Sequence, residues 1–195
     1  MNSIVTGSAE EVIAKTRLWL ERAVIGLNLC PFAKAVHVKN QIRYTVSNAT
    51  TPEMLSATLV HELQVLQESD PACIDTTLLI HPYVLHDFLD YNDFLEVADT
   101  VIDDLGLTGE IQVASFHPQY QFAGTEPDDI ENYTNRSPYP ILHLLREESI
   151  DIAVSAFPDA AAIFNRNMET MHRIGHAGWH DLDMHTPSNP TEPKK

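Results

Sequence analysis

Two histidines occupy matching positions in the sequence, each after a short apolar run and before a proline. The segment TLLIHPY contains His81, and the segment VASFHPQY contains His117. An imidazole titrates near neutral pH, so it can exchange protons in a reaction, and its neutral ring also binds divalent metals. The repeat predicts that the two histidines act together, either as acid and base or as ligands of one divalent metal ion. The alternative interpretation is that each histidine only ends a strand at a turn.

The second histidine opens a long polar segment, residues 118–140, that carries three further candidates. If the histidines bind a metal, Asp128 or its neighbour Asp129 is expected to complete the shell, as in two-His, one-carboxylate sites. Arg136 is the only Lys or Arg in residues 44–145. Its guanidinium is expected either to pair with a nearby Asp and brace the loop, or to grip the carboxylate or phosphate of a small anionic ligand. Tyr133 is expected either to pin the loop or to contact that ligand.

A cysteine and a group of histidines offer two further kinds of chemistry. Cys30 precedes a proline in NLCPFAKA, a pattern typical of thiol redox motifs, but no second cysteine follows at the required spacing. A packed, unreactive thiol is the alternative. His172 and His176 have the i, i+4 spacing of metal-binding helices, without the acidic residue that metalloprotease helices place between their histidines.

Composition limits the classes of partner. The formal net charge of −16 over 195 residues repels phosphate backbones and anionic lipids, which argues against binding to nucleic acids or membranes. Neither a signal peptide nor an apolar run long enough to span a bilayer is evident, so a cytoplasmic protein is expected. The sequence also lacks the glycine fingerprints of phosphate loops and the nucleophile elbow of serine hydrolases.

The elements that must position these residues follow from apolar periodicity. Ser8 and Glu11 have the spacing of a capping box at the start of a helix. We expect strands at 42–47, 76–81 and 111–117. Helices are expected at 9–27, at 52–70, around Phe94 to Leu105 with its end at Gly106, at about 139–157 and at about 159–174. The prediction is an α/β fold with a small, mostly parallel sheet of three or four strands and about five helices. An unrecognised edge strand is expected near Val36 or Ile152.

This topology gives the histidines a common location. Parallel strands joined by right-handed crossovers would bring His81 and His117 to the same edge of the sheet, where open α/β sheets usually bind ligands. Residues 1–178 are expected to form one domain, and residues 179–195, which contain His180 and His185, a loosely ordered tail.

Three segments resemble an uncharacterised bacterial family catalogued as domain of unknown function 1415. They are TRLWLERAVIGLNLCPFA, FHPQYQFAG and DDIENYTNRSPYPILHLLRE, and with their spacing they span most of residues 11–175. The resemblance brings no catalytic residues with it, because these motifs have no assigned chemistry. It does imply that CPFA and the NYTNRSPYP block belong to one signature, whereas the histidine-rich tail lies at or beyond its end.

Three functions are therefore considered. The first is a small-molecule enzyme or ligand-binding domain whose candidate residues are His81, His117, Asp128, Tyr133 and Arg136. The second is an acidic adaptor that binds another protein through its polar loop and has no catalytic site. The third is a thiol redox protein that uses Cys30. Neither the substrate nor the oligomeric state follows from the sequence.

Overall fold

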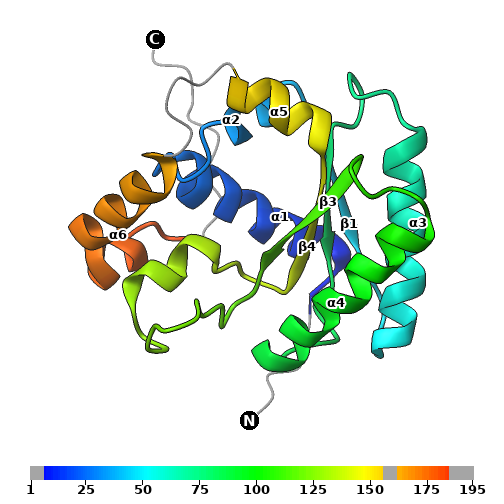
Figure 1. The fold of residues 1–195 in the computed structure, drawn as a ribbon. Coiled ribbons are helices and arrows are strands. Elements are labelled where there is room, and N and C mark those ends of the chain that lie inside the picture. The colour runs from blue at the N-terminus through cyan, green and yellow to red at the C-terminus, as the bar shows by residue number, and fades with distance from the viewer. Residues whose placement is uncertain (1–6, 156–161, 185–195) are drawn as a thin grey trace.

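The computed structural model describes residues 7–155 and 162–184, which form a four-stranded sheet with helices on both faces (Figure 1). The strands are β1 (Ile42–Val46), β2 (Thr76–Ile80), β3 (Ile111–Phe116) and β4 (Ile141–Arg146). The α-helices are α1 (Ala9–Trp19), α2 (Ala33–Val38), α3 (Pro52–Glu68), α4 (Phe88–Asp104), α5 (Glu147–Ser155) and α6 (Ala162–His180). A π-helix, η1 (Leu20–Ile25), continues α1, and a 3-10 helix, η2 (Ile130–Asn135), lies in the polar loop.

The predicted capping box at the start of α1 is confirmed. The Ser8 side chain accepts a hydrogen bond from the Glu11 backbone N–H at 3.3 Å, and the Glu11 carboxylate accepts one from the Ser8 backbone N–H at 2.9 Å. Two N–H groups that have no partner inside the helix are thereby satisfied. The helical segment ends at Ile25 with Gly26 as its C-cap, close to the expected end at residue 27. Thr51 likewise caps α3, with Pro52 in its first turn.

The prediction of a mostly parallel sheet is wrong. The strand order is β1-β2-β4-β3, with β1 and β2 parallel and β4 antiparallel to both of its neighbours. The sequence ILHLLR of β4 was expected to be the first part of a helix over 139–157. A short apolar run fits both periodicities, and a strand buried between two others need not alternate apolar and polar residues. The unrecognised strand is therefore central, whereas Val36 and Ile152 lie in helices α2 and α5.

Each face of the sheet supports its own hydrophobic core. Helices α3 and α4 pack on one face, where Leu59, Leu63 and Leu142 are completely buried. Helices α1 and η1 pack on the other face, where Trp19 and Ile80 are buried. Three further side chains of this second core are half-buried and come from the end of α6 and the segment after it: Trp179, Leu182 and Met184.

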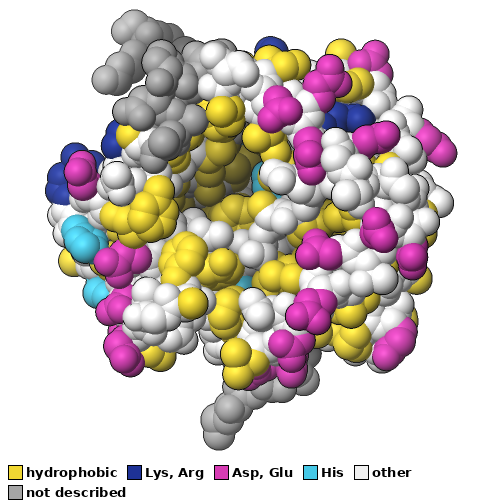
Figure 2. All heavy atoms as spheres, in the orientation of Figure 1, with side chains coloured by type: hydrophobic (Ala, Val, Ile, Leu, Met, Phe, Trp, Pro, Cys, Tyr) yellow, Lys and Arg dark blue, Asp and Glu magenta, His cyan; other side chains and the backbone are white. Residues whose placement is uncertain are grey.

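The second face is less completely covered near β3 and β4, where Phe116, His143 and Leu145 are half-buried. Hydrophobic side chains line a hollow in the surface between α5 and α6, while acidic side chains spread over the side of the molecule where α3 and α4 lie (Figure 2). Within residues 7–155 and 162–184, no helix has both the length and the apolar character needed to span a bilayer.

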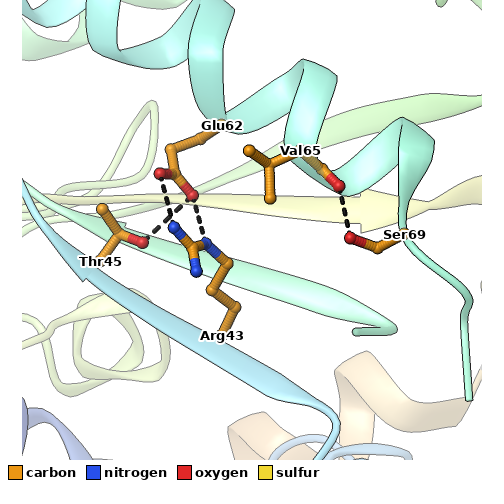
Figure 3. A network of polar contacts seen from close by, with 5 residues as sticks. All are labelled: Arg43, Thr45, Glu62, Val65 and Ser69. Atoms are coloured by element: carbon orange, nitrogen blue, oxygen red, sulfur yellow. Dashed lines mark hydrogen bonds and ion pairs between the residues drawn. The ribbon is translucent and has the colours of Figure 1, made fainter. Parts of the chain in front are cut away.

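An ion pair ties the edge strand β1 to helix α3 (Figure 3). The Arg43 guanidinium donates two hydrogen bonds to Glu62, at 2.7 Å and 3.1 Å, and the Thr45 hydroxyl donates a third at 3.1 Å. The Glu62 side chain is only 2% exposed, while that of Arg43 is 36% exposed. A carboxylate so deeply buried is tolerated only with such partners, because desolvation of an unpaired charge costs several kcal/mol.

Removal of Arg43 alone is expected to destabilise the protein more than removal of the whole pair. Arg43→Met leaves a buried carboxylate with Thr45 as its remaining partner, and we expect the free energy of unfolding to fall by about 2–3 kcal/mol. The double variant Arg43→Met/Glu62→Leu removes the charge as well and should recover most of that loss. Urea unfolding of the three proteins measures the difference. A double variant less stable than Arg43→Met would contradict this account.

Candidate functional site

The two histidines lie at the same edge of the sheet, as predicted, but not on neighbouring strands. Strands β2 and β3 point in the same direction, and β4 runs between them in the opposite direction. His81 follows β2, and its backbone N–H donates to the Pro140 carbonyl at 3.1 Å. His117 follows β3, and its N–H donates to the Asn135 carbonyl at 3.2 Å. Both side chains are completely buried.

Tyr91 of α4 packs against both imidazoles. Its ring centroid lies 5.8 Å from that of His81, in a stacked arrangement, and 5.0 Å from that of His117. The Tyr91 hydroxyl donates to the Ile141 carbonyl at 2.8 Å and accepts from the Phe116 N–H at 3.1 Å. One side chain thus connects the end of β3 with the start of β4. Sequence analysis missed this residue, although it lies one helical turn before Phe94 on the buried face of α4.

Hydrogen bonds fix the protonation of both rings. The Val84 carbonyl lies 3.2 Å from Nδ1 of His81, so this nitrogen carries the proton, and Nε2 is buried with no partner among the described residues. In His117, Nε2 donates to the Leu85 carbonyl at 3.1 Å, while Nδ1 accepts from the Gln119 N–H at 3.0 Å. Burial lowers the pKa of His81 to about 3 and that of His117 to about 4. Both rings are therefore neutral near pH 7 and hold turns in place.

Loss of the Tyr91 hydroxyl is expected to destabilise the protein. Tyr91→Phe leaves the buried Phe116 N–H and Ile141 carbonyl without their bridge, and we expect the free energy of unfolding to fall by about 2 kcal/mol. Tyr83→Phe is the matched control, because the Tyr83 hydroxyl makes only a 3.5 Å contact with the Gly7 carbonyl. Its cost should stay below about 0.5 kcal/mol. Equal urea midpoints for the two variants would refute a bridging role.

The buried histidines predict that stability falls in mild acid. A histidine whose pKa is lowered by folding takes up its proton more readily in the unfolded chain, so stability is lost as the pH drops below about 6.5. His143 on β4 acts in the same direction, because burial lowers its pKa to about 4. At pH 5 the loss from His81 alone should be about 2 kcal/mol relative to neutral pH.

Unfolding by urea at pH 7, 6 and 5 tests this expectation. His81→Asn keeps an amide nitrogen for the Val84 carbonyl and removes the titrating ring, so its stability should depend less on pH than that of the wild type. His61→Asn, at an exposed position on α3, is the control and should retain the wild-type dependence. Identical pH dependence in His81→Asn and the wild type would rule out a contribution from this ring.

The polar loop is organised around Asn132, which is completely buried. Its side-chain oxygen accepts from the Phe122 N–H at 2.9 Å and from the Thr125 hydroxyl at 2.8 Å. Its amide nitrogen donates to the Glu126 carbonyl at 2.8 Å. Asn135 in turn donates to the Ser115 carbonyl of β3 at 3.2 Å. These amides give the loop a fixed internal structure that the backbone alone cannot supply.

Arg136 braces the same loop through backbone carbonyls rather than through an acidic partner. Its guanidinium donates to the carbonyls of Tyr120, at 3.3 Å, and Pro127, and it lies 4.1 Å from the centroid of the Tyr133 ring. Its own carbonyl accepts from the Trp19 indole at 2.8 Å. No carboxylate of the described residues lies within ion-pair distance of this guanidinium. The positive charge is therefore held in place without being neutralised.

Arg136 lines a cleft of about 450 Å³ between the polar loop and the first turn of α4. Asp128 lies in the same cleft, together with Asp87, which caps α4 by accepting from the N–H groups of Leu89 and Asp90. The remaining lining residues are Phe88, Leu89, Pro118, Gln119, Gln121 and Pro127. This volume lies within the range of small-molecule sites, although the lining is more polar than that of most such sites.

The other predicted site residues are distributed around this cleft rather than within it. His81 and His117 are not among its lining residues. Tyr133 does not line the cleft but contacts Arg136, which does. Its ring also makes edge contacts with His176 and Trp179 of α6, at 5.2 Å and 5.4 Å between ring centroids. No group of three or more His, Cys, Asp or Glu side chains in the described ranges is arranged to hold a metal ion.

The histidines of α6 and the cysteine make separate contacts. His172 pairs with Glu131 of η2 at 2.7 Å, while His176 contacts Tyr133, so this i, i+4 pair joins α6 to the loop. His185 lies outside the described residues. Cys30 is half-buried, and burial raises the pKa of its thiol, although the N–H groups of Phe32 and Ala33 partly oppose this. A raised pKa is the opposite of what a reactive thiolate requires.

Comparison with known proteins identifies a family but no characterised relative. No curated protein and no solved structure matches the chain. A family model described as "Protein of unknown function (DUF1415)" matches residues 11–181, which confirms the predicted resemblance and extends it through α6. Because this match covers most of the chain, the protein belongs to the DUF1415 family.

Proposed function

We propose that this protein is a small-molecule-binding domain whose ligand occupies the cleft beside Arg136 and presents a carboxylate or phosphate group to it. The observation that carries the proposal is a guanidinium that lines a 450 Å³ cleft with no ion-pair partner among the described residues. In a chain of net charge −16, most of the surface repels anions, so an unpaired cation in a cleft attracts an anionic group selectively to that place.

The contacts of the loop already hold the Arg136 guanidinium in one orientation. Two of its five N–H groups are used by the carbonyls of Tyr120 and Pro127, and the Tyr133 ring supports its plane. An arginine already held in one orientation loses little conformational entropy when it binds. The remaining N–H groups can donate to the two oxygens of a carboxylate or phosphate.

The other residues of the cleft limit the class of ligand. Asp87 and Asp128 place two negative charges near the single positive one, which disfavours polyanions such as nucleoside triphosphates. Gln119 and Gln121 supply amide donors and acceptors, and Phe88 supplies an apolar surface. This set suits a compact molecule with one anionic group and other polar groups, for example a protonated amine that pairs with the carboxylates.

Within this proposal the buried histidines have a positioning role. His117 connects the loop to Leu85, two residues before Asp87, through its Nε2 hydrogen bond. His81 holds the same turn through its Nδ1 hydrogen bond to the Val84 carbonyl, and Tyr91 packs against both imidazoles. The metal, adaptor and thiol alternatives remain predictions from the sequence, and none has a comparable arrangement of residues to support it.

Binding is tested by calorimetry with succinate, glutamate and glycerol 3-phosphate. We expect saturable binding of at least one of these probes to the wild-type protein and a loss of affinity of about tenfold or more in Arg136→Met, the equivalent of one charge-assisted contact. Arg173→Met, at an exposed position on α6, removes the same charge outside the cleft and should leave the affinity unchanged.

A second variant separates loss of ligand contacts from collapse of the loop. Gln119→Trp fills part of the cleft from an exposed position without removing any contact of Arg136. It should also abolish binding while the melting temperature stays near that of the wild type. The proposal would be overturned by affinity that survives both cleft variants, or by the absence of saturable binding to all three probes.

A further inference from the structure

The charges of this acidic protein are divided unevenly along the chain. Residues 15–43 contain one acidic residue, Glu21, out of 28 in the sequence, and six of the twelve basic residues: Lys15, Arg17, Arg22, Lys34, Lys39 and Arg43. This segment forms the end of α1, then η1, α2 and β1. This segment is therefore basic, although the molecule as a whole repels anions.

Two of these six cations are already engaged, and four are exposed. Arg22 pairs with Asp183 at 3.5 Å, and Arg43 pairs with Glu62. The exposed cations are Lys15, Arg17, Lys34 and Lys39. Arg17 is distinguished from the other three because its guanidinium lies 4.4 Å from the centroid of the Tyr44 ring, where a cation–π contact holds it over β1.

Arg17 lines a cavity of about 50 Å³ that lies between α1, α2 and β1. The other lining residues are His37, Asn40, Ile42 and Tyr44. His37 Nε2 lies 3.4 Å from the Glu21 carboxylate, so Glu21 is partly occupied by its own partner. The volume corresponds to one small ion or one or two water molecules. This cavity is lined by none of the residues of the cleft beside Arg136.

Tyr44 contributes an unsatisfied donor at this place. Its hydroxyl is buried and has no hydrogen-bond partner among the described residues. Burial raises the pKa of Tyr44 to about 12, so the group stays protonated at physiological pH and can only gain from an acceptor. A buried hydroxyl without a partner costs about 1–3 kcal/mol. An acceptor oxygen in the cavity would offset this cost once a small movement of the Tyr44 ring exposes the hydroxyl to it.

We propose that the cavity beside Arg17 and Tyr44 is a second binding site, selective for a small oxyanion such as inorganic phosphate or the phosphoryl group of a small metabolite. The Arg17 guanidinium supplies the charge, and the side chains of Asn40, His37 and Tyr44 supply hydrogen-bond donors. The exposed lysines of the same segment raise the local concentration of anions. The small volume restricts the buried part of the ligand to a single such group.

Titration with inorganic phosphate, followed by two-dimensional amide NMR at constant ionic strength, tests the proposal. We expect saturable shifts at residues 15–44 and an affinity about tenfold lower in Arg17→Met. Tyr44→Phe removes only the hydroxyl and should also weaken binding, without loss of the fold. Lys39→Met is the matched control, because it removes a charge from the same surface but does not line the cavity, and its affinity should change less than twofold.

The outcomes distinguish a specific phosphate site from non-specific electrostatic attraction of phosphate to the basic surface. Equal weakening in Arg17→Met and Lys39→Met would indicate an adventitious ion only and would overturn the proposal, as would shifts that never saturate. Wild-type affinity in Tyr44→Phe would contradict a role for the buried hydroxyl. Phenyl phosphate carries the same phosphoryl group on a larger molecule, so it distinguishes free phosphate from a phosphorylated metabolite as the ligand. Binding tighter than that of inorganic phosphate indicates a metabolite, and weaker binding indicates the free ion. Neither result depends on Arg136.

Discussion

The hydroxyl of Tyr91 is the contact on which the arrangement of this molecule's loop edge depends. It bridges the last residue of β3 and the first residue of β4 at a point where two strands diverge. The rings of His81 and His117 both pack against the Tyr91 ring, so one helical residue contacts the ends of three strands. The polar loop leaves the sheet directly from this point, and its position is therefore fixed by a buried aromatic group.

The polar character of the loop follows from the need to satisfy backbone groups away from regular structure. Asn132 and Asn135 replace the hydrogen bonds that a helix or a sheet would otherwise provide, and Arg136 closes the loop across two carbonyls. Amides suit this task because each carries both donors and an acceptor. The same organisation leaves a guanidinium at the wall of a cleft, so the side chain that braces the loop is also the one proposed to bind an anionic ligand.

Acidic and basic residues are concentrated on different elements of the fold. Helices α3 and α4 contain nine of the 28 acidic residues and no Lys or Arg, whereas six of the twelve basic residues lie in residues 15–43, which form the end of α1, η1, α2 and β1. Separation of this kind creates regions of opposite potential on one small protein, so an anion repelled by most of the surface is directed toward the basic segment. The ion pair of Arg43 and Glu62 lies where these two regions meet and joins β1 to α3.

Sequence alone determined the features that depend on local physics. The capping box of α1, the cap of α3 and the strands β1, β2 and β3 follow from short-range hydrogen bonding and apolar periodicity, and the family signature follows from its motifs. The shared edge of His81 and His117 was also predictable, because β2 and β3 do run in the same direction. For Arg136 the sequence left two alternatives open, a pair with a nearby Asp or a contact with an anionic ligand, and it did not indicate the backbone carbonyls that the guanidinium contacts.

Only the tertiary structure decided the rest, because the deciding contacts are distant in sequence. Strand β4 is a strand because β2 and β3 offer it hydrogen bonds on both sides, and its own residues fit a helix equally well. The histidines are neutral because α4 and the turn after β2 bury them, which no pattern around either residue records. The cleft arises where residues 87–89 meet residues 118–136, two segments that only folding brings together.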